Sequence, residues 1–299
     1  DRFIAMISKE LVQKKFREIQ ESICSALNAE SCQEFSEDKW NYELGEGGGI
    51  TRVFSGDVIE KGGVNFSALN GKLSDKIAAK LKGGNDREFY ATGVSLVIHP
   101  KNPFVPTVHM NVRYLERGEK QWFGGGIDLT PYYPVKSDII TFHKQLKIVC
   151  DNHNPDYYPE FKRKCDDYFF IKHRNEARGV GGIFFDYLSN DLEKTFQFVL
   201  DVGNALNSLY IPLLSSYKNK VYSEEQKAFQ QIRRGRYVEF NLVYDRGTLF
   251  GLETQGRIES ILMSLPPQVR WNYNYKSKVG SPEAELSKFL IPQDWVNME

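Results

Sequence analysis

The sequence predicts an α+β fold: a single domain over residues 1–299, built on a large antiparallel β-sheet. Runs of alternating apolar and polar residues recur, most clearly over 89–115 and 121–130, which is the pattern of sheet strands. An amphipathic pattern over residues 3–28 predicts an N-terminal helix that covers the core. No repeat, linker or low-complexity segment divides the 299 residues, enough chain for one large core.

Composition excludes some partners. Lys plus Arg equals Asp plus Glu at 39 each, so no net charge draws the chain to nucleic acid or to a membrane surface. No apolar run approaches the ~20 residues of a membrane span. The four cysteines form no C-x-x-C pair, which indicates free thiols in a reducing compartment. We therefore expect a cytoplasmic protein; the alternative, the mitochondrial intermembrane space, requires that a targeting segment was removed before Asp1.

Elements of the first third follow from local patterns. Trp40 and Tyr42 lie in a strand-like stretch. The glycine run 45–49 predicts a turn or flap, since no Lys-Ser/Thr follows it as a nucleotide loop requires. Residues 61–67 read as a loop, and 73–81 as a short helix.

The segment 89–115 predicts two strands joined by a proline-rich connection over 99–106. If the strands pair as an antiparallel hairpin, Ser95 and His99 share one face with His109, Asn111 and Arg113. Such a face suits a carboxylated ligand, because guanidinium and amide groups donate hydrogen bonds to carboxylates. The alternative is an ordinary solvent-facing polar side.

The middle of the chain continues the mixed pattern. A strand over 121–130 contains three consecutive glycines, which allow close approach of a ligand, and Asp128 follows them as a candidate polar anchor. The remaining predictions here are helices over 137–150, 157–172 and 191–210, the last stopped by Pro212, and a glycine-hinged strand over 179–186.

The stretch 237–244 alternates apolar and polar residues and predicts a strand that ends at the charged turn Asp245-Arg246-Gly247. It would be either a platform for a site or a half-exposed strand with an ordinary turn. A capping box at Ser223–Gln226 starts the helix before it. A helix beginning at Gly256-Arg257 offers free amides and a guanidinium to a carboxylate. A last strand over 269–275 and a helix capped by Ser281 complete the chain.

Only five histidines occur, at 99, 109, 143, 153 and 173. None shows a tight metal-ligand spacing, so proton transfer is favoured over metal binding. The chain has no nucleophile elbow and no dinucleotide fingerprint.

Several motifs together resemble one enzyme family, the oxygen-dependent coproporphyrinogen III oxidases, in collinear order from about residue 40 onward. They are Thr51-Arg-Val-Phe, Gly63-Val-Asn-Phe-Ser67, His99-Pro-Lys-Asn-Pro, Pro106-Thr-Val-His-Met-Asn-Val-Arg113, Trp122-Phe-Gly-Gly-Gly-Ile-Asp-Leu-Thr-Pro131, His173-Arg-Asn-Glu-Ala-Arg178 and Arg233-Arg-Gly-Arg-Tyr-Val-Glu-Phe-Asn-Leu.

The resemblance implies a large, flat antiparallel sheet sandwiched between helices, and a homodimer with its contact region at about 237–271. It implies that two propionates of coproporphyrinogen III become vinyl groups, giving protoporphyrinogen IX, with molecular oxygen as co-substrate and no organic cofactor. Carbon dioxide and hydrogen peroxide leave.

The resemblance also implies roles for particular residues. The catalytic group would be His109 as proton donor, Asp245 as acceptor of a pyrrole proton, and Arg113. Substrate contacts would come from Ser95, Asn111, Arg113, Asp128, Arg178, Gly256 and Arg257. A divalent-metal site proposed for some relatives matches His99, His109, His143 and His173, but we expect no essential metal. The alternatives are a metal-dependent oxygenase and a non-catalytic carrier of tetrapyrroles or carboxylates.

Overall fold

The computed structural model describes residues 7–80, 86–253 and 256–298. Residues 3–6 of the predicted N-terminal helix, Leu81 at the end of the predicted short helix and residues 254–255 lie outside this part of the chain. Among the described residues, no helix combines the length and apolar character needed to cross a bilayer.

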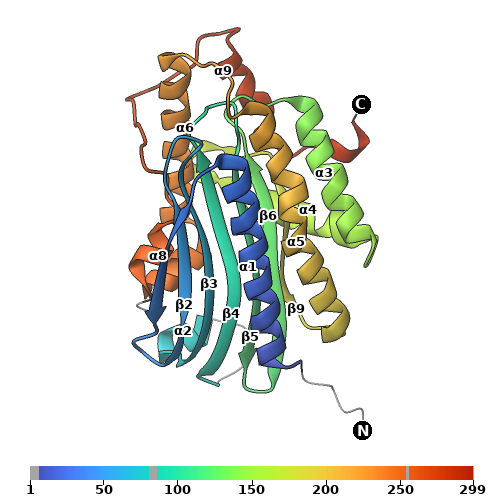
Figure 1. Ribbon diagram of the computed structural model, residues 1–299. Helices are drawn as coiled ribbons and strands as arrows, with labels where there is room; N and C mark the ends of the chain where they lie inside the picture. The colour runs from blue at the N-terminus through green and yellow to red at the C-terminus, as the bar shows by residue number, and fades with distance from the viewer. Residues whose placement is uncertain (1–6, 81–85, 254–255, 299) are drawn as a thin grey trace.

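The centre of the fold is a seven-stranded sheet in which every neighbouring pair is antiparallel, as the sequence predicts (Figure 1). Its spatial order is β1-β2-β3-β4-β5-β6-β9. The strands are β1 Phe35–Asn41, β2 Glu46–Phe54, β3 Ile59–Lys72, β4 Glu88–Pro100, β5 Thr107–Arg117, β6 Lys120–Thr130 and β9 Gly182–Leu188. A separate two-stranded ribbon pairs β7 Phe170–Ile171 with β8 Glu176–Ala177.

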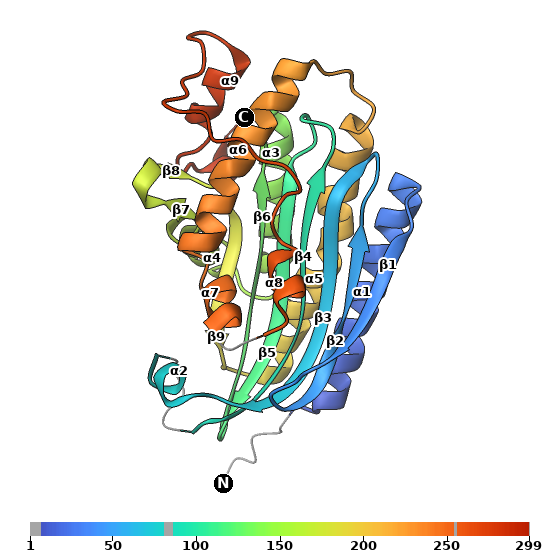
Figure 2. The ribbon, with the colours of Figure 1, turned by 90° about the vertical axis from the view of Figure 1, so that its left-hand side faces the viewer.

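Helices cover both faces of the sheet (Figures 1 and 2). Helices α1 and α5 lie on one face, with α3 beside α5, whereas α6, α7 and α8 lie on the other. The helices are α1 Lys9–Ser31, α2 Asp75–Lys80, α3 Lys136–Asp151, α4 Tyr157–Tyr168, α5 Leu192–Tyr217, α6 Glu224–Val243, α7 Arg246–Glu253, α8 Ile258–Leu262 and α9 Pro282–Glu285, with short 3₁₀ turns at Lys172–Arg174, Leu286–Lys288 and Trp295–Asn297.

The face toward α1 and α5 is the hydrophobic core. Alternate residues of the central strands meet across it, such as Leu96 opposite Met110 and Ile98 opposite Val108, all with no exposed surface. Each fully buried side chain of this size contributes roughly 1.5–3 kcal/mol to folding. Because side chains alternate along a strand, burying this set commits the intervening residues to the opposite face.

The prediction of a strand over 237–244 is wrong, because residues 237–243 complete α6 and Tyr244 is its C-cap. The capping box at Ser223 and Gln226 starts the helix, and no helix-breaking proline follows it in the segment. Buried positions then recur at Gln230, Arg234, Tyr237 and Asn241, a spacing of three and four residues that marks one helical face. Leu242 is 43 % exposed, whereas the alternating pattern would have buried it.

Other predicted elements also differ from the structure. Residues 61–67 form part of β3 rather than a loop, paired with β4 from Lys61 opposite His99 to Ser67 opposite Gly93. The stretch 269–275 is not a strand, since its backbone bonds to α6 through the Arg270 amide and the Gln231 carbonyl. Helix α5 continues through Pro212 to Tyr217, because burial of flanking side chains outweighs one missing backbone hydrogen bond.

A charged cluster anchors α6 to the sheet. The Glu60 carboxylate on β3 accepts hydrogen bonds from Arg234 at 2.7 Å and from Lys227 at 2.9 Å, both on α6. Arg234 is fully buried and also donates to the Pro100 carbonyl at 2.8 Å. Burial alone would raise the pKa of Glu60, but the two cations outweigh it and the pKa is lowered.

We predict that Glu60→Gln lowers the free energy of unfolding at pH 7 by about 3 kcal/mol, because two neighbouring cations lose their carboxylate. The folded-state pKa of Glu60 is depressed, so its contribution is present above the ordinary glutamate value of about 4.3 and is lost as pH falls below it. Denaturant unfolding between pH 3 and 8 should therefore show the two proteins converging at acid pH. A difference that is independent of pH would contradict this assignment.

Candidate active site

The face of the sheet opposite the core carries the polar residues that the sequence predicts as a site. Ser95 on β4 lies opposite Asn111 on β5, and Val97 lies opposite His109. On the other side of β5, His109 faces Asp128 and Arg113 faces Gly124 of β6. The antiparallel pairing expected for 89–115 is therefore confirmed, and it brings Ser95, His109, Asn111 and Arg113 onto one face.

His109 has one ring nitrogen fixed by a carboxylate. Its Nδ1 lies 2.7 Å from Oδ1 of Asp128, and its Nε2 lies 3.3 Å from Nδ2 of Asn111. The imidazole is 17 % exposed, so it is accessible from the polar face while its hydrogen-bond partners hold it. Phe169 packs edge-on against the ring at 5.7 Å. A histidine held this way is suited to accept or donate a proton at Nε2.

Asp128 is buried beneath His109 and paired with Arg178. One guanidinium nitrogen, Nη2, donates to both carboxylate oxygens at 3.0 and 2.8 Å, and both side chains are 2 % exposed. Nη1 donates to Oδ1 of Asn241 on α6 at 2.9 Å. The guanidinium also lies over the rings of Phe169, Tyr237 and Phe240 at 4.0, 4.4 and 5.0 Å.

This burial bears on the prediction that Asp128 and Arg178 contact substrate. Neither side chain reaches the surface, and each is occupied by the other. Burial would raise the pKa of Asp128, but the Arg178 charge and the His109 hydrogen bond together lower it, so the carboxylate is ionised. The two residues lie next to the candidate site rather than in its open part.

Arg113 provides an accessible cation on the same face. Its Nη2 lies 3.0 Å from Oδ2 of Asp186 on β9, and its Nη1 donates to Oδ1 of Asn111 at 3.3 Å. The side chain is 33 % exposed, and a guanidinium has five N–H donors, so several remain for a ligand carboxylate. Gly124 leaves room here, because a Cβ would lie 2.6 Å from Asp186 Oδ1.

Helix α8 lies in front of the sheet in Figure 2, and it contacts β2 and β3. Ser260 forms a 2.8 Å hydroxyl contact with Thr51, and its carbonyl accepts from Asn65 at 3.0 Å. The exposed Ser95 therefore lies on sheet surface between α8 and the His109 row. From β4 to β6 this surface spans about 10 Å, two strand spacings. A flat ligand fits over such a strip of sheet surface.

Gly256 and Arg257 lie at the start of α8. The Gly256 amide donates to the Gly251 carbonyl at 2.9 Å. The Arg257 guanidinium pairs with Asp38 on β1 and lies 6.0 Å from the ring of Trp40. Its side chain is 35 % exposed, so it is open to a ligand, but it faces the β1 edge rather than His109.

Asp245 caps α7. One oxygen accepts from the amide and hydroxyl of Thr248, each at 2.8 Å, and the other accepts from the Tyr168 hydroxyl at 2.9 Å. A carboxylate offers about four acceptor positions, so one remains for an N–H donor. Tyr168 stacks on Phe184, a β9 residue of the polar sheet face, with ring centroids 4.5 Å apart. This places Asp245 at the β9 margin of the face.

The four histidines named as a metal set do not come together. Among residues 7–80, 86–253 and 256–298, no group of three or more His, Cys, Asp or Glu side chains is arranged to hold a metal. His99 is buried between Thr107 and the Ser264 carbonyl. His143 lies between the Tyr158 hydroxyl and the Val180 carbonyl, and burial lowers its pKa to about 3. His173 lies against Tyr244 and Glu239 on the surface.

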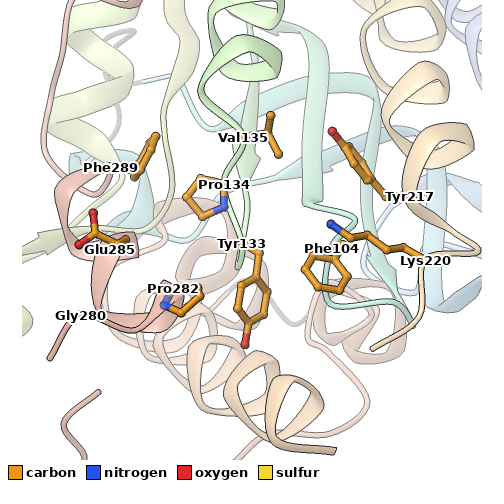
Figure 3. A pocket seen from close by; sticks show the side chains of 10 residues that line it. All are labelled: Phe104, Tyr133, Pro134, Val135, Tyr217, Lys220, Gly280, Pro282, Glu285 and Phe289. Atoms are coloured by element: carbon orange, nitrogen blue, oxygen red, sulfur yellow. The ribbon is translucent and has the colours of Figure 1, made fainter. Parts of the chain in front are cut away.

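A hollow at another place on the molecule contains none of these residues. It has a volume of about 420 Å³ and is lined by aromatic side chains including Phe104, Tyr133 and Phe289, with Lys220 over the Phe104 ring at 3.9 Å (Figure 3). The candidate site is therefore the sheet face around His109 rather than this hollow.

Comparison with known proteins matches the chain to one family. The family model for coproporphyrinogen III oxidase matches residues 11–295. The chain belongs to the coproporphyrinogen III oxidase family. The Dictyostelium discoideum relative is 48 % identical over 97 % of this chain and 95 % of its own length. The Drosophila melanogaster relative is 52 % identical over 93 % and 76 %, and the Prochlorococcus marinus (strain MIT 9312) relative 46 % over 97 % and 93 %. All three are named oxygen-dependent coproporphyrinogen-III oxidase.

Sequence reasoning missed four side chains that support this family member's candidate site. Asp186 holds Arg113, Tyr168 holds Asp245, and Asn241 and Tyr237 on α6 surround Arg178. Of the four, only Asp186 could have been found from the sequence, because it is a charged residue within an otherwise apolar strand. Assigning 237–244 to a strand put both residues on its polar face, whereas in α6 they lie four residues apart on the buried helical face that packs against Arg178.

The packing of α8 against the sheet can be tested at Gly63. A Cβ added there would lie 1.3 Å from Sδ of Met263, just beyond α8. We predict that Gly63→Ala lowers the free energy of unfolding by about 1–3 kcal/mol through overpacking. Adding Met263→Ala should recover part of this loss, because the truncated side chain makes room. Denaturant unfolding of both single variants and the double variant gives the coupling energy, and strictly additive losses would contradict the packing.

Proposed function

We propose that this protein catalyses the oxygen-dependent oxidative decarboxylation of coproporphyrinogen III, converting two propionates to vinyl groups and giving protoporphyrinogen IX. The observation that carries the proposal is the row of His109, Asn111 and Arg113 on one open sheet face. It combines a carboxylate-binding cation with an imidazole whose Nε2 is available for proton transfer. Family membership and the names of the three relatives support the same activity.

The chemistry explains why these residue types are needed. Each propionate loses its carboxylate as carbon dioxide, and the β carbon, which is attached to the pyrrole ring, loses a hydride to molecular oxygen. The electrons of the broken carbon–carbon bond form the vinyl double bond. The hydroperoxide anion then takes one proton to give hydrogen peroxide, so each decarboxylation consumes one proton. In this proposal oxygen is the oxidant and no organic cofactor takes part.

We assign the proton to His109. Protonated at Nε2, it donates to the hydroperoxide anion, while the ionised Asp128 stabilises the imidazolium. Arg113, with Asn111 and Ser95, holds a substrate propionate, and Arg257, next to Gly256 at the start of α8, holds a second. Asp245 accepts a pyrrole N–H at its remaining acceptor position and increases the electron density of the ring that is oxidised. These roles are part of the proposal.

The proposal is tested by incubating purified protein with coproporphyrinogen III in air and under strict anaerobiosis, with products weighed by mass spectrometry. We expect loss of two carboxyl groups in air only. If the substrate binds but no product forms in either condition, the protein is a carrier of tetrapyrroles rather than an enzyme.

We further propose that turnover requires no divalent metal. His99 and His143 use both ring nitrogens in hydrogen bonds with protein groups, and His173 lies against Glu239 elsewhere. Protein treated exhaustively with a chelator should therefore retain its turnover. Lost activity that returns on adding a metal ion would indicate a metal-dependent oxygenase instead.

We also propose a homodimer that uses the predicted contact region, about 237–271. Large apolar side chains are exposed there, and burying them against a second copy would remove them from water. They are Leu242, Val243, Leu249, Leu252, Ile258 and Trp271. Sedimentation equilibrium should give twice the 34.5 kDa chain mass, and Leu252→Glu should shift the equilibrium toward monomer. A wild-type monomer at all concentrations would contradict this.

The cysteines support a reducing compartment, and we propose the cytoplasm. Cys24, Cys32, Cys150 and Cys165 are all unpaired. Burial raises the pKa of the Cys150 thiol to about 12 and that of Cys24 to about 11, so both remain unreactive thiols.

A further inference from the structure

We propose that Asp128 and Arg178 act as positioning residues that hold His109 in the tautomer with its proton on Nδ1, leaving Nε2 as the nitrogen that exchanges protons. This inference deepens the proposed function and rests on it. It replaces the expectation that the two residues contact the substrate.

The Nδ1 side of His109 is determined by Asp128. An ionised carboxylate can only accept hydrogen bonds, and Oδ1 of Asp128 lies 2.7 Å from Nδ1. The proton between the two atoms therefore belongs to the imidazole.

The Nε2 side is determined by Asn111 and Arg113. A guanidinium can only donate, so the Asn111 atom that faces Arg113 at 3.3 Å is the amide oxygen. The amide nitrogen of Asn111 then faces Nε2 of His109 at 3.3 Å and donates to it. Nε2 therefore carries a lone pair in the neutral ring. Two independent contacts, one at each nitrogen, assign the same tautomer.

Arg178 determines the orientation and charge of Asp128. Its Nη2 donates to both carboxylate oxygens, and Asn241 and three aromatic rings hold the guanidinium from the other sides. Burial would lower the pKa of Arg178, but the Asp128 charge raises it, so the buried side chain remains a cation. A residue this enclosed acts on substrate only through its neighbours.

Asp128→Asn is the direct test. Arg178 only donates, so it holds the oxygen of the new amide and turns the amide nitrogen toward His109. Nδ1 must then accept a hydrogen bond, so the ring proton moves to Nε2. There it faces the N–H of the Asn111 amide, and the two donors repel each other. We expect kcat to fall roughly 100-fold or more, the range of a lost general acid–base group, while KM changes less than threefold. An unchanged kcat with a raised KM would indicate that Asp128 binds substrate, and it would overturn the inference.

Nitrogen NMR of protein labelled only at histidine reads the tautomer without turnover. The chain has five histidines, and a His109→Asn sample identifies the signals of His109. Wild-type His109 should show a protonated Nδ1 and an unprotonated Nε2, and Asp128→Asn should invert this pattern. A wild-type ring protonated at Nε2, or exchanging between tautomers, would overturn the inference even if every variant failed to fold.

Matched variants separate positioning from general damage. Asp201→Asn removes the carboxylate of another pair, His153 Nε2 to Asp201 at 2.7 Å on the surface, and should leave kcat, KM and the His109 signals unchanged. If the Asp128→Asn variant does not fold, a double variant that also carries Arg178→Gln takes its place. The double variant removes both buried charges and should fold, with kcat still reduced roughly 100-fold. Normal kcat in that double variant would contradict the inference. Wild-type protein without product would instead refute the proposed function, whatever its tautomer.

Discussion

The ion pair between Asp128 and Arg178 is the interaction on which the candidate site depends. It is buried at 2 % exposure on each side and joins three elements: β6, the segment after β8, and α6 through Asn241. A buried pair of this kind stabilises a fold only weakly against an apolar alternative, because desolvating both charges costs about as much as their attraction provides. Its value here is orientation, since it fixes His109 at the sheet surface.

The sheet divides the molecule into a face for folding and a face for chemistry. Apolar residues such as Leu96 and Met110 bury one face under α1 and α5, so the intervening polar residues must face the other way. On that second face glycine replaces a side chain where the site needs space, as at Gly124 beside Arg113. The same period of two that builds the core therefore also assembles the polar row.

Sequence patterns predicted the hairpin and its polar row because both depend on local alternation, which fixes the side of each residue. They failed for residues 237–244, where an eight-residue alternation coincides with a helical face and the capping box at Ser223 decides the outcome. They also missed the buried role of Arg178, which lies 50 residues after Asp128 and meets it only in the folded chain. The residue type correctly predicted that Arg178 binds a carboxylate. In the folded chain that carboxylate is the buried Asp128 rather than a group of the substrate.

The most direct test of this account is a crystal structure with coproporphyrin III, the oxidised and unreactive form of the proposed substrate. The account predicts a macrocycle lying flat over Ser95 and Asn111, with one propionate on Arg113 and another close to Nε2 of His109. Arg178 and Asp128 should keep their mutual contact and touch no ligand atom. A macrocycle bound in the hollow around Phe104 and Lys220, or a propionate that displaces Asp128 from Arg178, would contradict the account.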